Sequence, residues 1–434
     1  MDLGNIGNKL FKLIKRYISS SLFKSTGIYI VTNFLNSSIP FLLLPILTRY
    51  LSPTDYGIVS MFSITVVLIK IFVSMNIEGA IGRQYFDRGK INFSQYVSNC
   101  VIIILIATTV VGFIIYLLSE NISRVTSISK NWLISVLIVA FGQSLITINL
   151  TWWQVQMKSY YYGIFQVLLT LTNLVLSIIF VVFFSMKWQG RILAQLLSIG
   201  MFGFYSVLLF SKRGWLVLTY NREYIKDALK FGLPLIPHSL GGIAIAMTDR
   251  FLITNMVSIA ETGIYTVGAQ IGSIVGLVED AFNRAWVPWF FGKLSTNNFA
   301  DKIKIVKITY IYNILIIIFA LVLSFMAPYF LKILVGKDFK GAYIYVLWIS
   351  LGWAFNGMYK MVANYIFYVK KTHILAWITF ITGVVNIVIS YYLIKLNGTI
   401  GAAQGTMIAF FISYVLTFIL ASKVYKMPWN LKNI

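Results

Sequence analysis

Residues 58–81 read IVSMFSITVVLIKIFVSMNIEGAI, a stretch that is apolar along most of its length yet contains Lys70 and Glu78. About 18 or more mostly apolar residues in a row can cross a bilayer, whereas in a water-soluble protein they would leave no polar surface for solvent. A charge at membrane depth costs roughly 2.5–3.5 kcal/mol, so such charges seldom lack a role. The stretch therefore predicts a membrane-spanning helix that faces a polar interior.

Similar stretches recur along the chain of 434 residues, of which 59% are hydrophobic and only 11% are charged. We therefore predict an all-α polytopic membrane protein with about twelve transmembrane helices, and transport is the first hypothesis. The longest connection, between Ser211 and Leu229, is too small to fold as a soluble domain. The expected spans are Ile28–Leu47, Ile58–Ile81, Tyr96–Leu118, Trp132–Leu150, Ile164–Phe184, Ile192–Phe210, Ala228–Val257, Ile264–Phe291, Ile308–Ala327, Ala342–Val369, Ile374–Ile394 and Ile400–Leu420.

Lys and Arg residues predict which side of the membrane each connection faces, because they stay on the cytoplasmic side. Most of the 36 Lys and Arg residues fall on the side that holds both termini, so both termini are expected in the cytoplasm. This bias and attraction to anionic lipid headgroups explain the net charge of +23 without nucleic acid as a partner. The positive residues on the opposite side are Arg49, Arg124, Lys130, Lys187, Arg191, Lys332, Lys337, Lys340 and Lys395.

The ends and middle of the chain predict its organisation. Residues 4–24 carry apolar side chains on one helical face and basic ones on the other, so we predict an amphipathic helix on the cytoplasmic surface over residues 1–24. A disordered basic tail is the alternative. The predicted parts that follow are a six-helix lobe at 25–211, a cytoplasmic connecting loop at 212–227, a second six-helix lobe at 228–421 and a cytoplasmic tail at 422–434.

An internal repeat supports the two lobes. Thr48, Ser52, Asp55 and Gly57 recur with equal spacing as Thr254, Ser258, Glu261 and Gly263, and Gly190, Ala194 and Ser198 recur as Gly398, Ala402 and Thr406. With six spans in each half, the halves have the same orientation, which predicts parallel repeats with a substrate site between them. The alternative is that Ser-x-x-Glu-x-Gly is only a common helix start, an N-cap followed by a carboxylate.

Polar residues gather on one face of several predicted spans, which indicates a hydrated or mutually paired interior. Spans one, two, seven, eight and ten are the ones expected to line it. Their polar faces comprise Thr32, Asn33, Asn36 and Ser37; Ser63, Lys70, Ser74 and Glu78; His238, Gly242 and Asp249; Thr266, Gln270, Ser273, Asp280 and Arg284; and Asn356, Lys360 and Asn364.

The charged positions admit structural alternatives. Asp280 and Arg284 lie four residues apart, so they can neutralise each other. Asp249 and Arg250 are sequence neighbours and point about 100° apart on a helix, so we expect that they hardly share one partner. Lys70 and Lys360 have no acid within a turn of their own helices, which makes them candidates for binding an anionic ligand. A pair across helices with Glu78 or Glu279 is the alternative for these two lysines.

The sequence offers little for other chemistries. The chain lacks a Gly-x-x-x-x-Gly-Lys-Ser/Thr loop and a Ser-His-Asp pattern, so neither ATP hydrolysis by a P-loop nor a membrane hydrolase is expected. One cysteine, Cys100, and two histidines leave no convincing metal site, and we expect no cofactor. Energy for transport is then expected from an ion gradient, the membrane potential or the substrate gradient.

Several segments together resemble the bacterial polysaccharide flippases (Wzx-like O-antigen transporters), in the superfamily of MATE drug exporters and lipid II flippases. They spread over nearly the whole chain, and the blocks at 45–61 and 229–271 are the most specific. The segments are PILTRYLSPTDYGIVSM at 45–61, EGAIGRQYFD at 78–87, LKFGLPLIPHSLGGIAIAMTDRFLI at 229–253, ETGIYTVGAQI at 261–271, AFNRAWVPWFF at 281–291 and NGTIGAAQGT at 397–406.

The resemblance implies a MATE-like fold of two six-helix lobes and a substrate, an oligosaccharide linked to polyprenyl pyrophosphate, that moves from the cytoplasmic to the periplasmic leaflet. It implies an inner-membrane protein that acts in O-antigen or lipopolysaccharide biosynthesis as a monomer, alone or with a polymerase. In this family the anionic head is held by cavity Arg and Lys residues, here Lys70, Arg83, Arg250, Arg284 and Lys360. Asn33, Asn36, Gln270, Asn356 and Asn364 are then candidates for sugar contacts, and Glu78, Asp249 and Asp280 for ion coupling.

Two other classes share these features in part. A MATE-like exporter of small organic cations would have the same fold, but its cavity is expected to be dominated by acids, whereas here bases are at least as numerous. A membrane polysaccharide polymerase or glycosyltransferase would have a similar composition, but it is expected to carry its catalytic residues on a sizeable extramembrane loop. The predicted connections contain no such loop, so an enzyme is not favoured.

Overall fold

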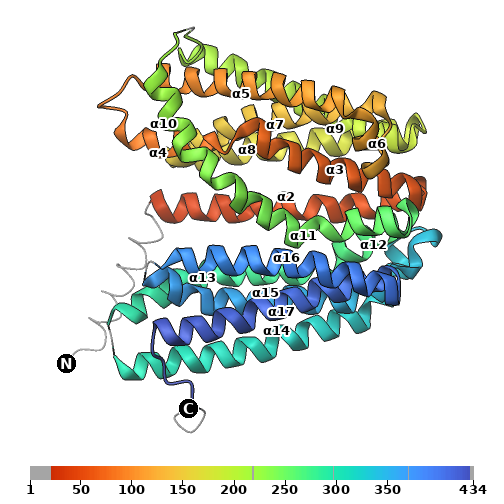
Figure 1. Cartoon of the computed structure of the whole chain (residues 1–434), viewed down its shortest axis with the longest axis vertical. Helices are drawn as coiled ribbons and strands as arrows, with labels where there is room; N and C mark the ends of the chain where they lie inside the picture. The colour runs from red at the N-terminus through yellow and green to blue at the C-terminus, as the bar shows by residue number, and fades with distance from the viewer. Residues whose placement is uncertain (1–20, 218, 297, 370, 431–434) are drawn as a thin grey trace, which may run out of the picture. The chain divides into compact units, whose positions relative to one another are not determined.

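The computed structural model describes residues 21–217, 219–296, 298–369 and 371–430, apart from some side chains within 21–40 and 372–376 (Figure 1). Within these ranges the chain forms helices and their connections, without strands. The predicted surface helix at 1–24 lies almost entirely outside the described residues, and the first described helix is α2.

Each predicted span coincides with one helix or with two or three consecutive helices. Nine helical segments of the described residues are long and apolar enough to cross a membrane, and that all twelve spans cross it stays a prediction, as does their orientation. The main helices are α2 (Ser21–Tyr50), α3 (Pro53–Ser74), α4 (Ile77–Gln84), α5 (Phe93–Leu117), α6 (Ser119–Thr126), α7 (Lys130–Val155), α8 (Ser159–Ile178), α9 (Lys187–Lys212), α10 (Arg222–Gly232), α11 (Ile236–Met256), α12 (Ile259–Gly272), α13 (Ile274–Ser295), α14 (Phe299–Leu334), α15 (Tyr343–Tyr368), α16 (Thr372–Asn397) and α17 (Thr399–Val424).

Two predicted spans are interrupted. The stretch at 58–81 bends between α3 and α4, where Met75 and Asn76 have φ values of 48° and 54°, in the left-handed region that ends helices. The predicted span at 264–291 is divided at Ser273 into α12 and α13. Helix α10 also begins at Arg222, so part of the segment expected as a connecting loop at 212–227 is helical. Hydropathy does not detect these interruptions, because the segments remain apolar on both sides of each break.

The helices group into two compact units. Unit 1 comprises residues up to 43, 69–117 and 134–235, and unit 2 comprises residues 44–68, 118–133 and 236–434. Helices α2 and α3 therefore contribute residues to both units. The linear lobe boundaries expected from the sequence remain a prediction, because these units are defined by contacts and not by membrane position.

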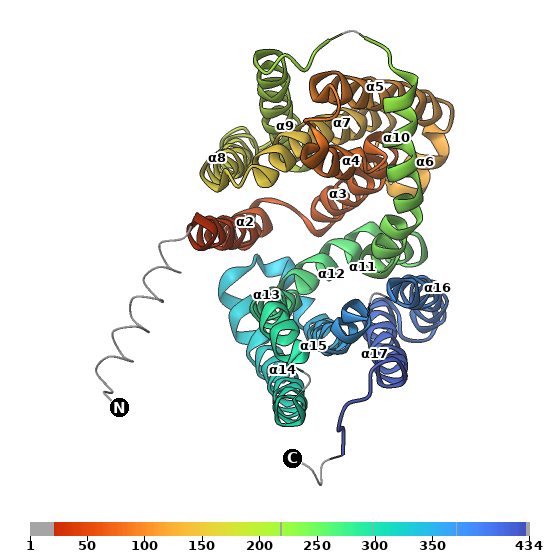
Figure 2. The ribbon, with the colours of Figure 1, turned by 90° about the vertical axis from the view of Figure 1, so that its left-hand side faces the viewer.

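Unit 1 is built on helix pairs that approach closely. Helices α8 and α9 pack against each other, and α10 packs across α4 and α5 (Figure 2). A Cβ on Gly232 would lie 2.1 Å from the carbonyl oxygen of Met75, so α10 touches the turn between α3 and α4. Gln84 Nε2 and the Tyr96 hydroxyl donate to Asp227 Oδ2 at 2.8 and 2.9 Å, which ties α4 and α5 to α10.

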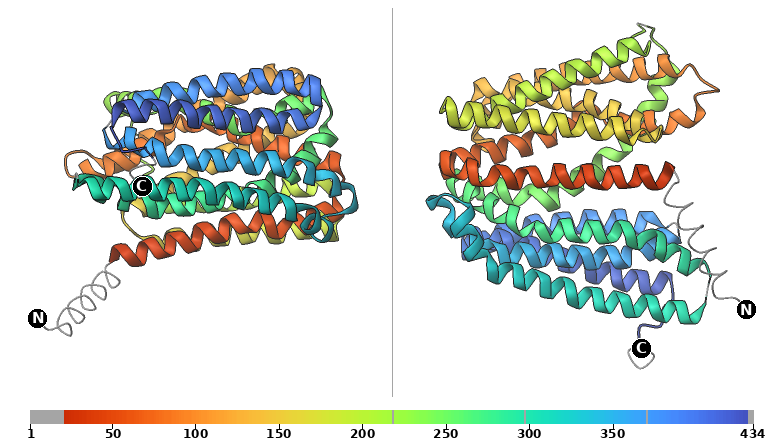
Figure 3. Two further views of the ribbon diagram at one scale, coloured as in Figure 1. Left: turned by 90° about the horizontal axis from the view of Figure 1, so that it is seen from below. Right: turned by 180° about the vertical axis from the view of Figure 1, so that it is seen from behind.

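Unit 2 contains a bundle in which α15 is central. It packs against α12, α13, α14 and α17, while α16 packs against α17 and α11 (Figure 3). The outer side of α14 exposes large apolar side chains, among them Ile314, Leu315, Ile318 and Phe325. An apolar face of this size on a helix that can span a membrane is suited to lipid.

The repeated motif begins two helices of unit 2 in the same way. Ser52 and Asp55 cap the start of α3, with Asp55 N–H donating to Ser52 Oγ at 3.2 Å and Ser52 N–H donating to Asp55 Oδ2 at 3.0 Å. At the start of α12, Glu261 N–H donates to Ser258 Oγ at 3.1 Å. The motif is thus a helix start, as the alternative interpretation held.

The two motifs also contact each other, which a common helix start does not require. A Cβ on Gly57 would lie 2.0 Å from the carbonyl oxygen of Ile259, and a Cβ on Gly263 would lie 2.0 Å from that of Pro53. Ser60 and Thr266, which are 206 positions apart, share a hydrogen bond of 2.9 Å. The same separation relates Gly57 to Gly263 and Pro53 to Ile259, so the repeats meet across a local two-fold axis near Ser60 and Thr266.

We expect Gly57→Ala to lower the free energy of unfolding by about 1–3 kcal/mol, because the added methyl group meets a backbone oxygen that cannot rotate away. Gly200→Ala in α9 is the matched control, since no heavy atom lies within 4 Å of its Cβ position. In this control, replacing a helical glycine by alanine is expected to raise the free energy of unfolding by roughly 0.5–1 kcal/mol. Thermal unfolding in detergent measures both variants. Equal melting temperatures of Gly57→Ala and Gly200→Ala would contradict the close contact of α3 with α12.

Candidate functional site

Acidic and basic side chains meet inside unit 2, between α13 and α15. Lys360 Nζ lies 3.0 Å from Glu279 Oε1 and 2.5 Å from Asp280 Oδ1. Asn356, one turn before Lys360, donates from Nδ2 to the same Glu279 oxygen at 2.7 Å. The Glu279 side chain is fully buried, whereas those of Lys360 and Asp280 are 24% and 54% exposed. One ammonium is shared by two carboxylates, so the group is net negative when both acids are ionised.

The contacts continue one turn further. Asn364 Nδ2 donates to Asn283 Oδ1 at 3.3 Å. Asn364 follows Lys360 by four residues, and Asn283 follows Glu279 by four. Residues four apart lie on one face of a helix, so this bond extends the same contact between α13 and α15. We call this set the α13–α15 polar seam; it comprises Glu279, Asp280 and Asn283 of α13 and Asn356, Lys360 and Asn364 of α15.

Glycines on α12 and α13 bring the seam together. A Cβ on Gly272 would lie 2.7 Å from the Ile349 side chain, and one on Gly276 would lie 2.8 Å from the Trp353 ring. Such small residues allow helices in membranes to approach closely. Glu279 follows on the same face at the next turn and is therefore directed at α15.

Glu279 is only partly satisfied. Its Oε1 receives both hydrogen bonds described above, whereas the buried Oε2 has no hydrogen-bond partner among the described residues. Gly357 makes room for this oxygen, because a Cβ there would lie 2.7 Å from Glu279 Oε2 and 2.5 Å from the Tyr312 hydroxyl oxygen. A buried carboxylate oxygen without a donor is costly while the acid is ionised.

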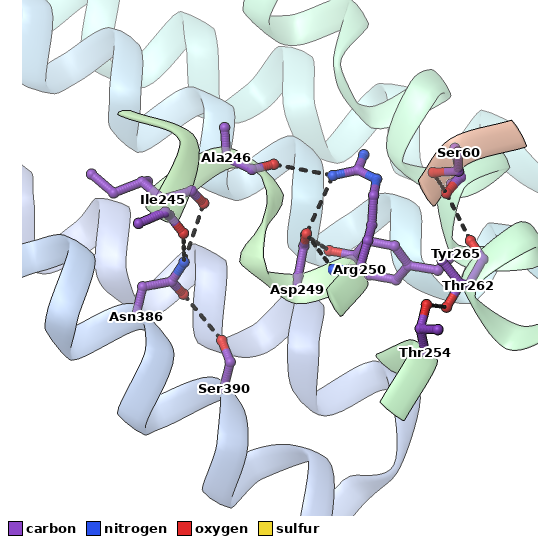
Figure 4. A network of polar contacts seen from close by, with 12 residues as sticks. Ser60, Ile245, Ala246, Asp249, Arg250, Thr254, Thr262, Tyr265, Asn386 and Ser390 are labelled. Atoms are coloured by element: carbon purple, nitrogen blue, oxygen red, sulfur yellow. Dashed lines mark hydrogen bonds and ion pairs between the residues drawn. The ribbon is translucent and has the colours of Figure 1, made fainter. Parts of the chain in front are cut away.

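A second charged group lies between α11 and α12 (Figure 4). Arg250 Nη1 lies 3.2 Å from Asp249 Oδ1 and donates to the Ala246 carbonyl oxygen at 3.0 Å. Tyr265 of α12 donates its hydroxyl to Asp249 Oδ2, and the Arg250 guanidinium lies 5.6 Å from the Tyr265 ring centroid. Asp249 is 3% exposed, so both of its oxygens are engaged within the protein.

The expectation that Asp249 and Arg250 hardly share a partner is therefore wrong. The long Arg250 side chain folds back along α11, and both residues reach Tyr265 despite their angular separation. Figure 4 also shows how α16 holds this helix: Asn386 Nδ2 donates to the Ile245 carbonyl oxygen at 3.1 Å. Ser390 in turn donates to Asn386 Oδ1 at 3.0 Å.

In unit 1, Lys70 differs from the charged residues described above, which form salt bridges. Its Nζ donates to the Thr147 hydroxyl oxygen at 3.1 Å, and it takes part in none of the salt bridges between described residues. Lys70 is half-buried near the C-terminal end of α3. In the part of the chain that the structure describes, no carboxylate lies within salt-bridge distance of its ammonium, although Glu78 is close enough to interact with it electrostatically.

The amide side chains predicted to contact sugar differ in how many hydrogen bonds they already make within the protein. Asn36 is fully used, since its Nδ2 donates to Gln166 Oε1 at 2.7 Å and its Oδ1 accepts from the Thr170 hydroxyl at 2.8 Å. Gln270 accepts from the Tyr56 hydroxyl at 3.1 Å, but its buried Nε2 has no hydrogen-bond partner among the described residues. Asn33 lies in α2, and its side chain is not among those described.

Three predicted charges form no salt bridge among the described residues. Arg83 on α4 and Arg284 on α13 are exposed, and Glu78 at the start of α4 is half-buried. The suggested pairing of Asp280 with Arg284 does not form, because Asp280 turns to Lys360 on the neighbouring helix. Helical spacing identified the possible partner on the same helix but not the stronger one across the interface.

Glu279 is the residue that sequence reasoning placed only as a possible partner of Lys360. The spacing of Gly268, Gly272 and Gly276 could have assigned it to the face that contacts α15, since Glu279 continues that row. Among the described residues, no group of three His, Cys, Asp or Glu side chains is placed to hold a metal ion.

Comparison with known proteins places the chain in a family of polysaccharide biosynthesis. Residues 22–292 match the model of a family described as polysaccharide biosynthesis protein. A protein of the Lsg locus of Haemophilus influenzae is 29% identical over 360 residues, which are 82% of this chain and 87% of that protein.

Two solved structures share the fold. An inward-facing multidrug resistance transporter of the MATE family superposes with a TM-score of 0.73 at 16% identity, over 91% of this chain and 97% of that one. The lipid II flippase MurJ, in an inward closed conformation, has a TM-score of 0.71 at 13% identity, over 92% of this chain and 87% of that one. With the apolar helices, these likenesses identify an all-helical, multi-pass membrane protein of the MATE-like fold.

Proposed function

The chain belongs to the polysaccharide biosynthesis protein family, and on this premise we propose that it flips a lipid-linked oligosaccharide across the membrane. The substrate is a repeat unit carried on polyprenyl pyrophosphate, moved from the cytoplasmic to the periplasmic leaflet for O-antigen or another surface polysaccharide. The observation that carries the proposal is Lys70, an ammonium on a membrane helix without a carboxylate partner among the described residues.

The physical need for such a protein follows from the substrate. A pyrophosphate and several sugars cannot enter hydrocarbon, because each unpaired polar group costs several kcal/mol there. An ammonium that is already desolvated offers a strong, charge-assisted hydrogen bond to phosphate. Lys70 suits this role better than Lys360, whose ammonium is held by two acids. Arg83, Arg250 and Arg284 remain secondary candidates for the headgroup.

Amide groups supply the contacts for sugar hydroxyls. Gln270 is favoured, because its Nε2 is a buried donor without a partner in the described part of the chain. Asn356 and Asn364 are held by their neighbours in the polar seam and would have to exchange those bonds for sugar. Asn36 would have to release Gln166 and Thr170, and Asn33 stays a candidate from the sequence alone.

Ion coupling is proposed at the polar seam. A proton on Glu279 would remove one of the two negative charges that hold Lys360, leaving the ammonium shared with Asp280 alone. Protonation at this point would thus change what Lys360 can bind, which is how a gradient can bias two conformations. Glu279 joins Asp280, Asp249 and Glu78 as coupling candidates, and Asp249 is the least free of them because both its oxygens are engaged.

The remaining features of the proposal follow the family. The protein resides in the bacterial inner membrane with both termini in the cytoplasm, acts as a monomeric transporter without enzymatic chemistry, and supplies a polysaccharide polymerase. Rocking of two lobes would give alternating access. None of these steps requires a cofactor.

Complementation tests the proposal. We expect expression of this chain to restore surface polysaccharide in a bacterium that lacks its own O-unit flippase, provided the host makes an accepted sugar unit. The matched assay is flipping of a fluorescent polyprenyl-pyrophosphate saccharide in proteoliposomes, which removes dependence on the host. Failure in proteoliposomes, with resistance to cationic dyes in cells, would favour the second candidate. That candidate is a MATE-like exporter of organic cations, which the acids Glu279 and Asp280 would serve.

A further inference from the structure

A basic cavity lies in unit 2, away from the polar seam. It has a volume of about 680 Å³ and forms where the end of α2 meets the segment that follows α14. Its lining includes four cations, Arg49, Lys332, Lys337 and Lys340, and one acid, Asp338. The volume falls within the range of about 300–1,000 Å³ that is usual for small-molecule sites.

The cations of this cavity outnumber the acids around it. None of the four takes part in a salt bridge between described residues. Arg49 donates from Nη2 to the Ile333 carbonyl oxygen at 3.3 Å, which leaves its other N–H groups available. With Asp338 as the single acid in the lining, the cavity carries a clear excess of positive charge.

The position of the cavity makes this excess unusual. Within unit 2, the end of α14 that leads to α15 lies at the opposite end of the bundle from the last turn of α17 (Figure 1). On the predicted topology this end lies on the side of the membrane opposite the cytoplasm. Lys and Arg are disfavoured on that side. Four of the few positive residues on that side nevertheless surround one cavity, so their placement is not explained by topology.

The walls of the cavity are held together by a direct backbone contact. Gly336 N–H donates to the Thr48 hydroxyl oxygen at 3.1 Å, and a Cβ on Gly336 would lie 2.0 Å from the Thr48 carbonyl oxygen. Arg49, next to Thr48, and Lys337, next to Gly336, are therefore fixed close to each other at the backbone. The basic side chains extend from a rigid frame, which reduces the entropy lost on binding a ligand.

We propose that this cavity binds an oxyanion, of the phosphate or pyrophosphate type, at the extracytoplasmic end of unit 2. Arg and Lys around a cavity recognise phosphate through charge-assisted hydrogen bonds. Two sources share this chemistry: the headgroup of an anionic membrane lipid, and the pyrophosphate of a lipid-linked saccharide that has crossed the membrane. The second source rests on the proposed function, whereas oxyanion binding itself does not.

Binding of inorganic pyrophosphate to the full-length protein in phosphatidylcholine nanodiscs tests the site. We expect Lys337→Gln/Lys340→Gln to weaken the affinity by about tenfold or more, since each basic residue near an anionic group contributes about 1 kcal/mol. Lys187→Gln is the matched control, because it removes an exposed positive charge predicted on the same side but outside the cavity. It is expected to change the affinity by less than about twofold.

The variants are also compared by thermal unfolding. In the described ranges neither Lys337 nor Lys340 donates a side-chain hydrogen bond or forms a salt bridge, so Lys337→Gln/Lys340→Gln should melt as the parent does. Adding Arg49→Gln is expected to weaken binding further, and Gly336→Ala should weaken it by displacing the frame. Equal loss of affinity in the cavity variants and in Lys187→Gln would overturn the proposal, whatever the outcome of the transport assays.

A second arm separates the two sources. If a membrane lipid occupies the site, phosphatidylglycerol in the nanodiscs should lower the apparent affinity for pyrophosphate in the parent and in Lys187→Gln, but much less in the cavity variant. If the transported lipid occupies it, phosphatidylglycerol should compete equally weakly in all three proteins, and the cavity variant should flip the saccharide more slowly. Either result supports an oxyanion site and assigns its occupant.

Discussion

Lys360→Met is expected to destabilise the protein by about 3 kcal/mol, because it leaves the buried Glu279 without its cation. This is the lower end of the range for breaking a buried ion pair, since Asp280 is half exposed and water can compensate it. For a unit of this size the change corresponds to a fall of roughly 6–12 °C in melting temperature. Thermal unfolding of the detergent-solubilised protein, followed by size-exclusion chromatography, measures it.

The double variant Glu279→Gln/Lys360→Met separates stability from transport. Removing both charges of the buried pair should bring the melting temperature back near that of the parent, because neither partner remains unpaired. The double variant should not flip the substrate, since the Glu279 carboxyl group that we propose for coupling is gone. Recovery of flipping together with stability would mean that Lys360 serves only to neutralise Glu279, and the coupling proposal would fail.

Lys70→Met is expected to have the opposite profile, with little change in stability and a large loss of transport. Among the described residues Lys70 donates to the Thr147 hydroxyl and forms no salt bridge, so removing its charge relieves desolvation without breaking an ion pair. A charge-assisted hydrogen bond to phosphate is worth about 1.5–3 kcal/mol, which predicts roughly a ten- to hundredfold lower flipping rate at low substrate concentration. The proteoliposome assay, with protein amounts matched, gives the rate.

Thr147→Val is the control for Lys70. It removes the hydroxyl that accepts from the ammonium but keeps the positive charge, so flipping should fall by less than about threefold. Lys70→Arg should retain part of the activity, because the guanidinium also binds phosphate but has a different reach. A flipping rate in Lys70→Met within twofold of the parent would exclude Lys70 as the headgroup ligand and remove the main support for the proposed function.

Much of the architecture follows from local properties of the chain. A helix in a membrane satisfies its own backbone hydrogen bonds, so length and hydropathy suffice to locate it. For this reason the predicted segments coincide with helices, and the helix starts at Ser52 and Ser258 could be identified from three or four residues. The break at Met75 and Asn76 escaped prediction, because left-handed residues inside an apolar segment leave no mark in hydropathy.

The charged groups were less predictable. The spacing correctly predicted that Asn356, Lys360 and Asn364 lie on one side of their helix, since residues four apart share a helical face. It left Glu279 as only one alternative partner of Lys360, and the pair of Asp280 with Arg284, which it also left open, does not form because Asp280 pairs with Lys360. For Asp249 and Arg250 the angular argument failed, because it treated the side chains as short and ignored how far an arginine reaches.

The sequence alone was sufficient to predict a helical membrane protein with an internal repeat and with charged residues inside its membrane spans. These properties depend on local hydrophobicity, spacing and backbone hydrogen bonding, all of which are encoded within single segments. Only the folded structure shows that Glu279 lies buried against Lys360, that Lys70 forms no salt bridge among the described residues, and that the motifs of Gly57 and Gly263 meet across a two-fold axis. Such pairings depend on which helices become neighbours and at what height they cross, and packing of segments far apart in sequence sets both.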